Sequence, residues 1–225
     1  MFSKRILLSL FIPVGLVVAA GATRMGDAPI ADRAINPVAV PTSQTAAVRY
    51  VVTASGNEAR YRLREKLVGM EIPYDAVGTT PGIKGAIAFD AAGKVIPAES
   101  KLTIDATAFK SDKDRRDGYV QRRLLETEKY PTVEFVPTVI RGLPASIPAS
   151  GARSFEMDGN LTVKGVTRPT TWKVSANFQG DKVTGNAYTG FTFADFEMEK
   201  PSVSVILTLA DDIRLEYDFV LQRAK

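Results

Sequence analysis

The sequence predicts an all-β fold, an antiparallel barrel of about eight or nine strands with one short helix inserted after the fourth strand. Three observations lead to it. Apolar and polar residues alternate from Val48 onward, as in strands with one buried face. Short turn sequences separate the alternating runs, and several runs exceed the usual strand length of about five or six residues. A long twisted sheet with one apolar face must close or fold into a sandwich, and a barrel is favoured because closure also removes exposed edges.

The N-terminal segment has the features of an export signal. Lys4 and Arg5 precede an uncharged apolar stretch, residues 6–20, and Ala20-Gly21-Ala22 matches a secretory cleavage site. Residues 1–22 are therefore interpreted as a signal peptide, which places the mature protein in the periplasm or outside the cell. The alternative is a retained N-terminal membrane anchor, although the apolar stretch is short for a span of roughly 20 residues.

The next segment, residues 23–47, is rich in Ala and Pro without periodicity and indicates a disordered tether. The barrel domain is assigned to residues 48–225. The chain has 29 basic and 25 acidic residues, a net charge of +4, and losing Lys4 and Arg5 with the signal peptide lowers this to +2. Such a small excess gives little support for nucleic-acid binding, which needs clustered positive charge.

The strands are expected in chain order, each identified by the apolar residues that share one face. Turn sequences such as Gln179-Gly180-Asp181 make neighbouring strands antiparallel. Small inward residues, among them Gly159 and Gly185, are expected to leave interior volume that is either empty or occupied. The runs are Tyr50, Val52; Ala59, Tyr61, Leu63; Ile83, Ile87, Phe89; Leu102, Ile104; Val133, Phe135, Val139; Phe155, Met157, Leu161, Val163; Trp172, Val174, Ala176, Phe178; Val183, Ala187, Phe191, Phe193; and Ile213, Leu215, Tyr217, Phe219, Leu221.

One segment breaks the period of two and predicts the helix. It runs from Ser111, a candidate N-cap, to about Glu126, with acidic residues in its first turn. Tyr119, Val120 and Leu124 share a face that can lie on the barrel. The rest of the segment is highly charged.

The absence of Cys and His excludes much chemistry. It removes disulfides, thiol nucleophiles, Ser-His-Asp triads and His-ligated metals. An enzyme would have to work with carboxylates, Lys, Tyr or Ser. Asp195 and Glu197 are candidate carboxylates, and with Glu199, Asp211 and Asp212 they could also be imagined as a calcium site. Because no recognised ligand spacing supports such a site, no catalytic residue, metal or cofactor is assigned.

Three motifs together resemble the YceI-like family. They are Ser111-Asp-Lys-Asp-Arg-Arg-Asp-Gly-Tyr119, then Leu124-Leu-Glu-Thr-Glu-Lys-Tyr-Pro-Thr-Val-Glu-Phe135, then Gly159-Asn-Leu-Thr-Val-Lys-Gly-Val-Thr-Arg-Pro169 followed by Trp172. The resemblance covers Val48 to the C-terminus. It implies an extended lipocalin-like barrel, exported in bacteria, that binds a polyisoprenoid, a quinone or a similar long amphiphile. Transient contact with a membrane and a homodimer are further expectations, and nucleic acid is not an expected partner.

The residues expected to contact such a lipid are inward-facing side chains, mostly aromatic: Phe89, Phe135, Phe155, Leu161, Trp172, Phe178, Phe191, Phe193, Tyr217 and Phe219. Candidates for contacting a polar head group are Arg115, Arg116, Arg122 and Arg123. The sequence leaves two alternatives open. The inward side chains can fill an eight-stranded barrel by themselves, and the arginines can form a solvated helix face paired with nearby acids. The chain would then be a structural or interaction module whose basic helix contacts a partner.

Overall fold

The computed structural model of the chain describes residues 47–144 and 146–225. The predicted signal peptide, residues 1–22, and all but the last residue of the predicted tether, residues 23–47, lie outside the described residues. The strands are β1 (Val48–Val52), β2 (Glu58–Leu67), β3 (Tyr74–Thr80), β4 (Ile83–Phe89), β5 (Lys101–Asp105), β6 (Lys110–Ser111), β7 (Thr132–Arg141), β8 (Ser150–Val163), β9 (Val166–Gln179), β10 (Lys182–Thr192), β11 (Ile206–Leu209) and β12 (Asp212–Arg223). The helical segments are η1 (Pro97–Glu99), η2 (Ala106–Ala108), α1 (Asp114–Tyr119), the π-helical turn η3 (Val120–Leu124) and η4 (Ala194–Phe196).

Eight strands close the predicted antiparallel barrel, in the order β1-β4-β5-β7-β8-β9-β10-β12. The closing contact pairs Tyr50 with Arg223 and Val52 with Leu221. Its longest hairpin, β8–β9, has 14 residues in each strand, and the buried residues of β9 and β12 alternate as the sequence predicts. The predicted fold class is therefore confirmed.

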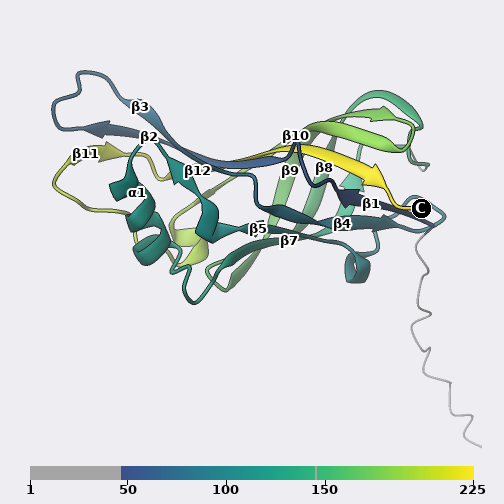
Figure 1. Cartoon of the computed structure of the whole chain (residues 1–225), viewed down its shortest axis with the longest axis horizontal. Coiled ribbons are helices and arrows are strands. Elements are labelled where there is room, and N and C mark those ends of the chain that lie inside the picture. Colours follow the sequence, from purple (N-terminus) through teal and green to yellow (C-terminus); the bar gives the residue numbers. More distant parts are fainter. Residues whose placement is uncertain (1–46, 145) are drawn as a thin grey trace, which may run out of the picture. The chain divides into compact units, whose positions relative to one another are not determined.

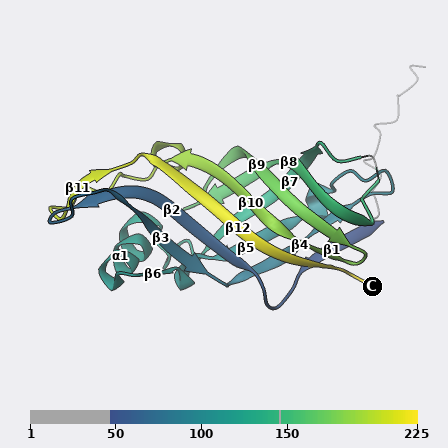
Figure 2. The ribbon, with the colours of Figure 1, turned by 90° about the horizontal axis from the view of Figure 1, so that it is seen from above.

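The barrel wall is extended on one side because β12 is longer than its pairing with β1. Beyond β1, β12 pairs with β2, which in turn pairs with β3 and at its far end with β11, and β3 pairs with β6. The extension and α1 lie together at one end of the barrel, away from the C-terminus (Figures 1 and 2). We call this the open end.

Buried Asn57 fixes the break between β1 and β2. Its side-chain oxygen accepts hydrogen bonds from the Val220 backbone N–H at 3.0 Å and the Tyr217 hydroxyl at 2.9 Å. Its side-chain amide donates to the Thr53 carbonyl oxygen at 2.9 Å. The amide side chain thus supplies hydrogen bonds that the backbone ladder would otherwise leave unmade.

Three strands were missed by the sequence prediction, and their composition explains why. The inward side chains of β3 are Ala76, Gly78 and Thr80, too small or polar to give an apolar alternation. Strand β6 has only two residues, and the four residues of β11 are half-buried or exposed. All three belong to the extension of the barrel.

The helix begins later than predicted, because Ser111 belongs to β6 and α1 begins at Asp114. Ser111 is not the N-cap. Its hydroxyl and its backbone N–H both donate to the carboxylate of buried Asp117, at 2.6 and 2.9 Å. The predicted apolar face is confirmed, with Val120 buried and Leu124 partly buried against the core.

Candidate functional site

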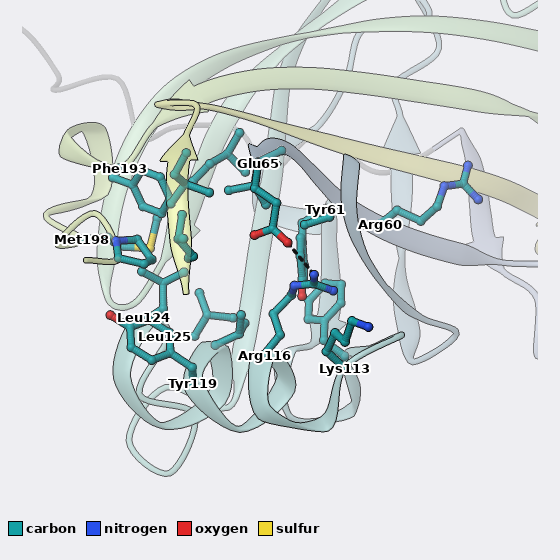
Figure 3. A pocket seen from close by; sticks show the side chains of 18 of the residues that line it. Arg60, Tyr61, Glu65, Lys113, Arg116, Tyr119, Leu124, Leu125, Phe193 and Met198 are labelled. Atoms are coloured by element: carbon teal, nitrogen blue, oxygen red, sulfur yellow. Dashed lines mark hydrogen bonds and ion pairs between the residues drawn. The ribbon is translucent and has the colours of Figure 1, made fainter. Parts of the chain in front are cut away.

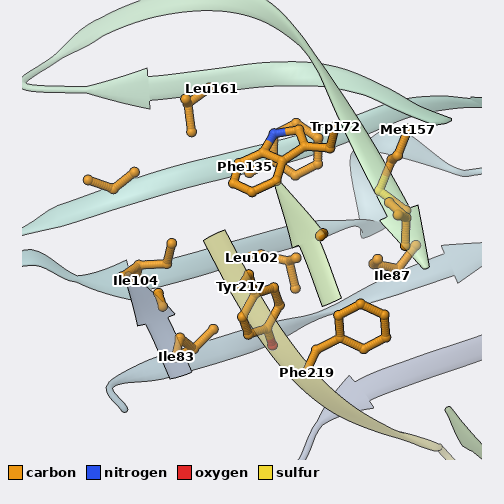
Figure 4. Packing of buried hydrophobic residues seen from close by; sticks show 14 of the residues in the cluster. Ile83, Ile87, Leu102, Ile104, Phe135, Met157, Leu161, Trp172, Tyr217 and Phe219 are labelled. Carbon is orange, nitrogen blue, oxygen red and sulfur yellow. The ribbon is translucent and has the colours of Figure 1, made fainter. Parts of the chain in front are cut away.

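The interior of the barrel has two parts that differ in packing. In the part enclosed by the closed barrel, aromatic side chains leave a void of only about 80 Å³. Phe135 and Trp172 pack with ring centroids 5.5 Å apart, and Tyr217 and Phe219 with centroids 5.7 Å apart (Figure 4). This part, which we call the packed half, is a solid core.

The small inward residues do not create empty space there. A Cβ atom placed on Gly159 would lie 2.5 Å from the Phe135 ring, and one on Gly185 would lie 2.7 Å from the Phe219 ring. The rings occupy the volume that the glycines leave. The interior volume expected beside these two glycines is therefore occupied by the protein's own side chains.

A cavity of about 710 Å³ opens at the other end of the interior (Figure 3). It lies among β2, β3, β11, β12, α1, η3 and the segment that follows η4. A volume of this size suits a ligand of small-molecule size. Most of the lining is aliphatic: Leu63, Leu67, Val68, Val120, Leu124, Leu125, Val133, Val163, Met198, Val203, Val205, Ile206, Leu209, Ile213 and Leu215.

The extension of the sheet forms one part of the cavity wall, and strands of the closed barrel contribute residues such as Val133 and Val163. Ala59 and Ala76 line the wall, and the ring of Tyr61 lies against Gly78, where an added Cβ would be 2.3 Å from ring atoms. Residues of α1 and η3, including Val120 and Leu124, form another part of the wall. The cavity thus lies between a sheet and a short helical segment.

A buried ion pair joins that helical segment to the sheet. The Arg116 guanidinium on α1 donates to the Glu65 carboxylate on β2 at 2.6 Å, and both side chains line the cavity (Figure 3). The Tyr74 hydroxyl donates to the same carboxylate at 2.5 Å and accepts from Arg116 at 2.9 Å. Arg116 also pairs with Asp112. Burial, together with the hydrogen bond to Glu65, raises the pKa of Tyr74 to about 12.

The predicted lipid-contacting residues are divided between the two halves. Phe191 and Phe193 line the cavity. Leu161 is fully buried and lines neither the cavity nor the void. The others surround the void of the packed half: Phe89, Phe135, Phe155, Trp172, Phe178, Tyr217 and Phe219. Their contact with a lipid stays a prediction, and the larger free volume lies elsewhere.

The predicted head-group residues are divided too. Arg115 and Arg116 line the cavity, but Arg116 is held by Glu65 and Asp112. Arg122 and Arg123 are exposed and are not part of the lining. Within residues 47–144 and 146–225, no carboxylate forms an ion pair with Arg115, Arg122 or Arg123.

Sequence reasoning missed most of the cavity wall. The alternation of Ala59, Tyr61 and Leu63 continues inward to Glu65, and an acidic residue at a buried strand position was the available signal. Met198 carried no periodic signal, because it follows the turn η4. Alternation in the sequence identifies the inward-facing residues. It does not show where those residues pack against one another and where they leave a cavity.

Two of the carboxylates considered for catalysis or calcium binding, Asp195 and Glu197, have other partners. Asp195 accepts hydrogen bonds from the Thr192 backbone N–H at 2.6 Å and hydroxyl at 2.9 Å, and these bonds lower its pKa. Glu197 pairs with Arg168. Among the described residues, no group of three or more acidic side chains is arranged to hold a metal ion. Nor does any helix in this part of the chain have the length and hydrophobicity needed to cross a membrane.

Comparison with known proteins identifies the family. The family model for the YceI-like domain matches residues 50–221. The chain belongs to the YceI-like domain family. It is similar to a UPF0312 protein of Pseudomonas putida, with 26% identity over 192 residues that cover 81% of this chain and 93% of the relative. A UPF0312 protein of Pseudomonas fluorescens is also 26% identical, over 83% of this chain and 95% of its own.

Solved structures share the fold of this YceI-like chain. A polyisoprenoid binding domain from Saccharophagus degradans, implicated in plant cell wall breakdown, superposes with a TM-score of 0.58 at 13% identity, covering 78% of this chain and 98% of that domain. BcnA from Burkholderia cenocepacia gives a TM-score of 0.55 at 20% identity, covering 75% of this chain and 98% of its own. At these identities the similarity shows the fold alone.

Proposed function

We propose that this YceI-like chain is a binding protein, not an enzyme, that holds one long-chain isoprenoid or a similar amphiphile such as a quinone. The observation that carries the proposal is the aliphatic cavity of about 710 Å³ beside an otherwise packed interior. The polyisoprenoid binding domain of the same fold supports the choice of ligand class. A solid barrel serving only as an interaction module accounts less well for that cavity.

Burial of an apolar chain supplies enough free energy for tight binding. Each buried methylene contributes roughly 0.8 kcal/mol, so about fifteen contribute on the order of 10 kcal/mol before ordering costs are subtracted. No polar contact is needed for affinity. Polar contacts are then free to select which end of the ligand faces outward.

The polar end of the ligand belongs near α1 in this proposal. Lys113 and Arg115 are exposed cations that line the cavity, and both can meet an anionic or carbonyl-bearing head group. Arg116 contributes less, because Glu65 and Asp112 already hold its guanidinium. The head-group role proposed for the predicted arginines therefore centres on Arg115.

Export completes the proposal. Residues 1–22 have the pattern of a cleaved signal peptide, which supports a periplasmic or secreted carrier or store of lipid. Contact with a membrane belongs to the same role, because a ligand this apolar has to be collected from a membrane.

The test compares two substitutions of Ala by Phe at inward positions. Ala76→Phe places a ring in the cavity, whereas Ala176→Phe places the same ring in the packed half. Native mass spectrometry of protein purified from its own host should find lipid on the wild type and at least tenfold less on Ala76→Phe. The free energy of unfolding of both variants is also measured by urea titration.

Overpacking should cost Ala176→Phe about 1–3 kcal/mol of unfolding free energy, and Ala76→Phe less than that. Wild-type protein that repeatedly carries no extractable lipid would overturn the proposal. So would an Ala76→Phe variant that is folded and as fully loaded with lipid as the wild type.

A further inference from the structure

Exposed apolar side chains gather at the open end of the barrel. Of the eight large hydrophobic residues that are exposed in the described part of the chain, six lie on two adjoining segments. Ile72 is 72% exposed, Val68 59%, and Val205 and Leu207 56% each. We call these six residues the apolar rim: Val68, Met70, Ile72, Val203, Val205 and Leu207.

Backbone hydrogen bonds make the apolar rim one surface. The Val68 N–H donates to the Val205 carbonyl oxygen at 2.9 Å, and Ile206 pairs with Leu67 where β11 meets β2. The connection between β2 and β3 and the segment leading into β11 are thus held side by side. Figure 1 shows both at the same end of the barrel as α1. An exposed patch of this kind on a stable domain marks a surface that meets protein or membrane.

The rim is continuous with the cavity. Val68, Val203 and Val205 belong to the rim and also line the cavity wall. An apolar ligand that leaves the cavity there passes from one aliphatic surface to another without crossing a ring of polar groups. The rim is therefore placed where such a ligand enters and leaves.

Unpaired positive charge lies at the same end. Arg115, Arg122 and Arg123 are exposed on α1 and η3 with no ion-paired carboxylate among the described residues. Around the rim itself the acidic and basic side chains balance: Lys66 and Lys200 against Glu71 and Glu199. On α1 and η3 four arginines stand against two acidic residues, Asp114 and Asp117, so these two segments carry a net charge of +2.

The basic residues of β2 give a contrast, because their charge is neutralised. Arg60 pairs with Glu58, Glu216 and Asp218, and both Arg62 and Arg64 pair with Asp75. The face of β2 thus lacks the free positive charge that α1 and η3 carry. An anionic surface is attracted to α1 and η3 more than to the face of β2.

We propose that the apolar rim inserts into the interface of an anionic lipid bilayer, with Arg122 and Arg123 held against its head groups. This inference rests on the proposed function, since it gives the route by which the ligand reaches the cavity. A bilayer fits better than a second copy of the chain, because a second copy would cover the cavity mouth and carry the same positive charge. Each basic residue near an anionic membrane adds to the attraction, and salt weakens it.

The experiment measures binding to vesicles by co-flotation, with the full mature chain and two vesicle compositions. One is phosphatidylcholine alone, and the other is an equal mixture of phosphatidylcholine and phosphatidylglycerol. The rim variant is Ile72→Ser with Leu207→Ser, two rim residues that do not line the cavity. The matched control is Val51→Ser with Val139→Ser, two exposed apolar residues on β1 and β7.

Wild type and control should bind the anionic vesicles equally, and the rim variant at least tenfold more weakly. Arg122→Gln with Arg123→Gln should lower binding to anionic vesicles about tenfold and remove most of its salt dependence. Equal vesicle binding by the rim variant and the wild type would overturn the inference. So would a wild-type dimer in size-exclusion chromatography that the rim variant dissolves, because the rim would then be a contact between copies.

Lipid content separates failure of this inference from failure of the proposed function. The rim variant should keep the wild-type amount of bound lipid in native mass spectrometry when lipid is supplied in detergent. Loaded protein that does not bind vesicles sinks only the membrane inference. Protein that binds vesicles through the rim but never holds lipid sinks the proposed function instead.

Discussion

Tyr61 shows how one residue shapes both the sheet and the cavity. Its ring lies over Gly78 on the neighbouring strand and packs near Phe109, with ring centroids 5.4 Å apart. The side chain is buried and lines the cavity. Burial raises its pKa to about 12, although the nearby positive charge of Arg116 opposes the shift. The pKa of the Tyr61 phenol therefore reports on how well water is excluded from around its side chain.

The pKa of Tyr61 is expected to lie above the ordinary value for a tyrosine. Ultraviolet titration of the wild type should show one more phenol ionising near pH 12 than Tyr61→Phe, in which Tyr74 still ionises near pH 12. Because the folded state raises this pKa, the contribution to stability is complete below the unfolded value of about 10 and disappears as the pH rises through about 12. A wild type and variant whose difference titrates near pH 10 in the folded state would contradict a buried Tyr61.

At the scale of elements, α1 depends on β2 for its position. The helix has six residues, too few to be stable alone, and its N-cap residue Lys113 makes no side-chain capping bond. The Arg116–Glu65 ion pair and the apolar contacts of Val120 hold it beside the cavity. Buried ion pairs add little stability compared with apolar replacements, but removing one partner leaves a buried charge.

Single and double substitutions of this pair should therefore give opposite results. Arg116→Leu alone should lower the free energy of unfolding by about 3 kcal/mol, because Glu65 keeps a buried charge without its cation. Arg116→Leu combined with Glu65→Leu should recover most of that loss. The measurement is the free energy of unfolding in urea of the wild type, the two single variants and the double variant, which together form a double-mutant cycle. If the double variant loses as much as the sum of the singles, the two residues do not act as a pair.

The ion pairs of Arg60, Arg62 and Arg64 on β2 predict that the protein becomes less stable at acid pH. Hydrogen bonds from Arg64 and then Arg62 lower the pKa of Asp75. Burial acts to raise the pKa of Glu216, but hydrogen bonds from Arg60 and Arg62 outweigh it and lower the value. Because folding lowers both pKa values, their contribution is present above the unfolded values near 4 and is lost as the pH falls through the folded values.

Thermal unfolding should therefore show a melting temperature that falls below about pH 4 in the wild type. The fall should be shallower in Asp75→Asn with Glu216→Gln, whose melting temperature at neutral pH should be lower. Asp211→Asn is the control, because Asp211 is exposed and makes no ion pair with the described residues. A double variant whose acid transition follows that of the wild type would rule out these two carboxylates as the cause.

How far the sequence predicts each element depends on its inward side chains. Strand β12 was predicted because Ile213, Tyr217 and Phe219 are large and alternate with polar residues. Strand β3 was missed because Ala76 and Gly78 give no apolar signal. Of these two small residues, Ala76 lines the cavity, whereas the Tyr61 ring occupies the space over Gly78. Prediction from aromatic inward faces therefore identified residues of the packed half. Most residues of the cavity wall were identified only in the structure.

At the scale of the molecule, the closed barrel and its extension have separate tasks. Eight strands close a barrel whose packed half is filled by its own rings, so we expect this part to stay folded without a ligand. The extension adds β2, β3, β6 and β11, and its strands β2, β3 and β11 line the unfilled cavity together with barrel residues such as Val133 and Val163. A ligand in the cavity should therefore stabilise the extension more than the barrel.

The single tryptophan of the chain tests this division, because Trp172 lies in the packed half. Trp172 packs against Phe135 and not against the cavity, so removing lipid with a detergent wash should leave its fluorescence emission unchanged. Trp172→Phe combined with Phe191→Trp moves the only indole to the cavity wall. Its emission should shift to longer wavelength when lipid is removed and water enters. A shift of equal size in the wild type would mean that the ligand reaches the packed half, where seven of the predicted aromatic contacts lie.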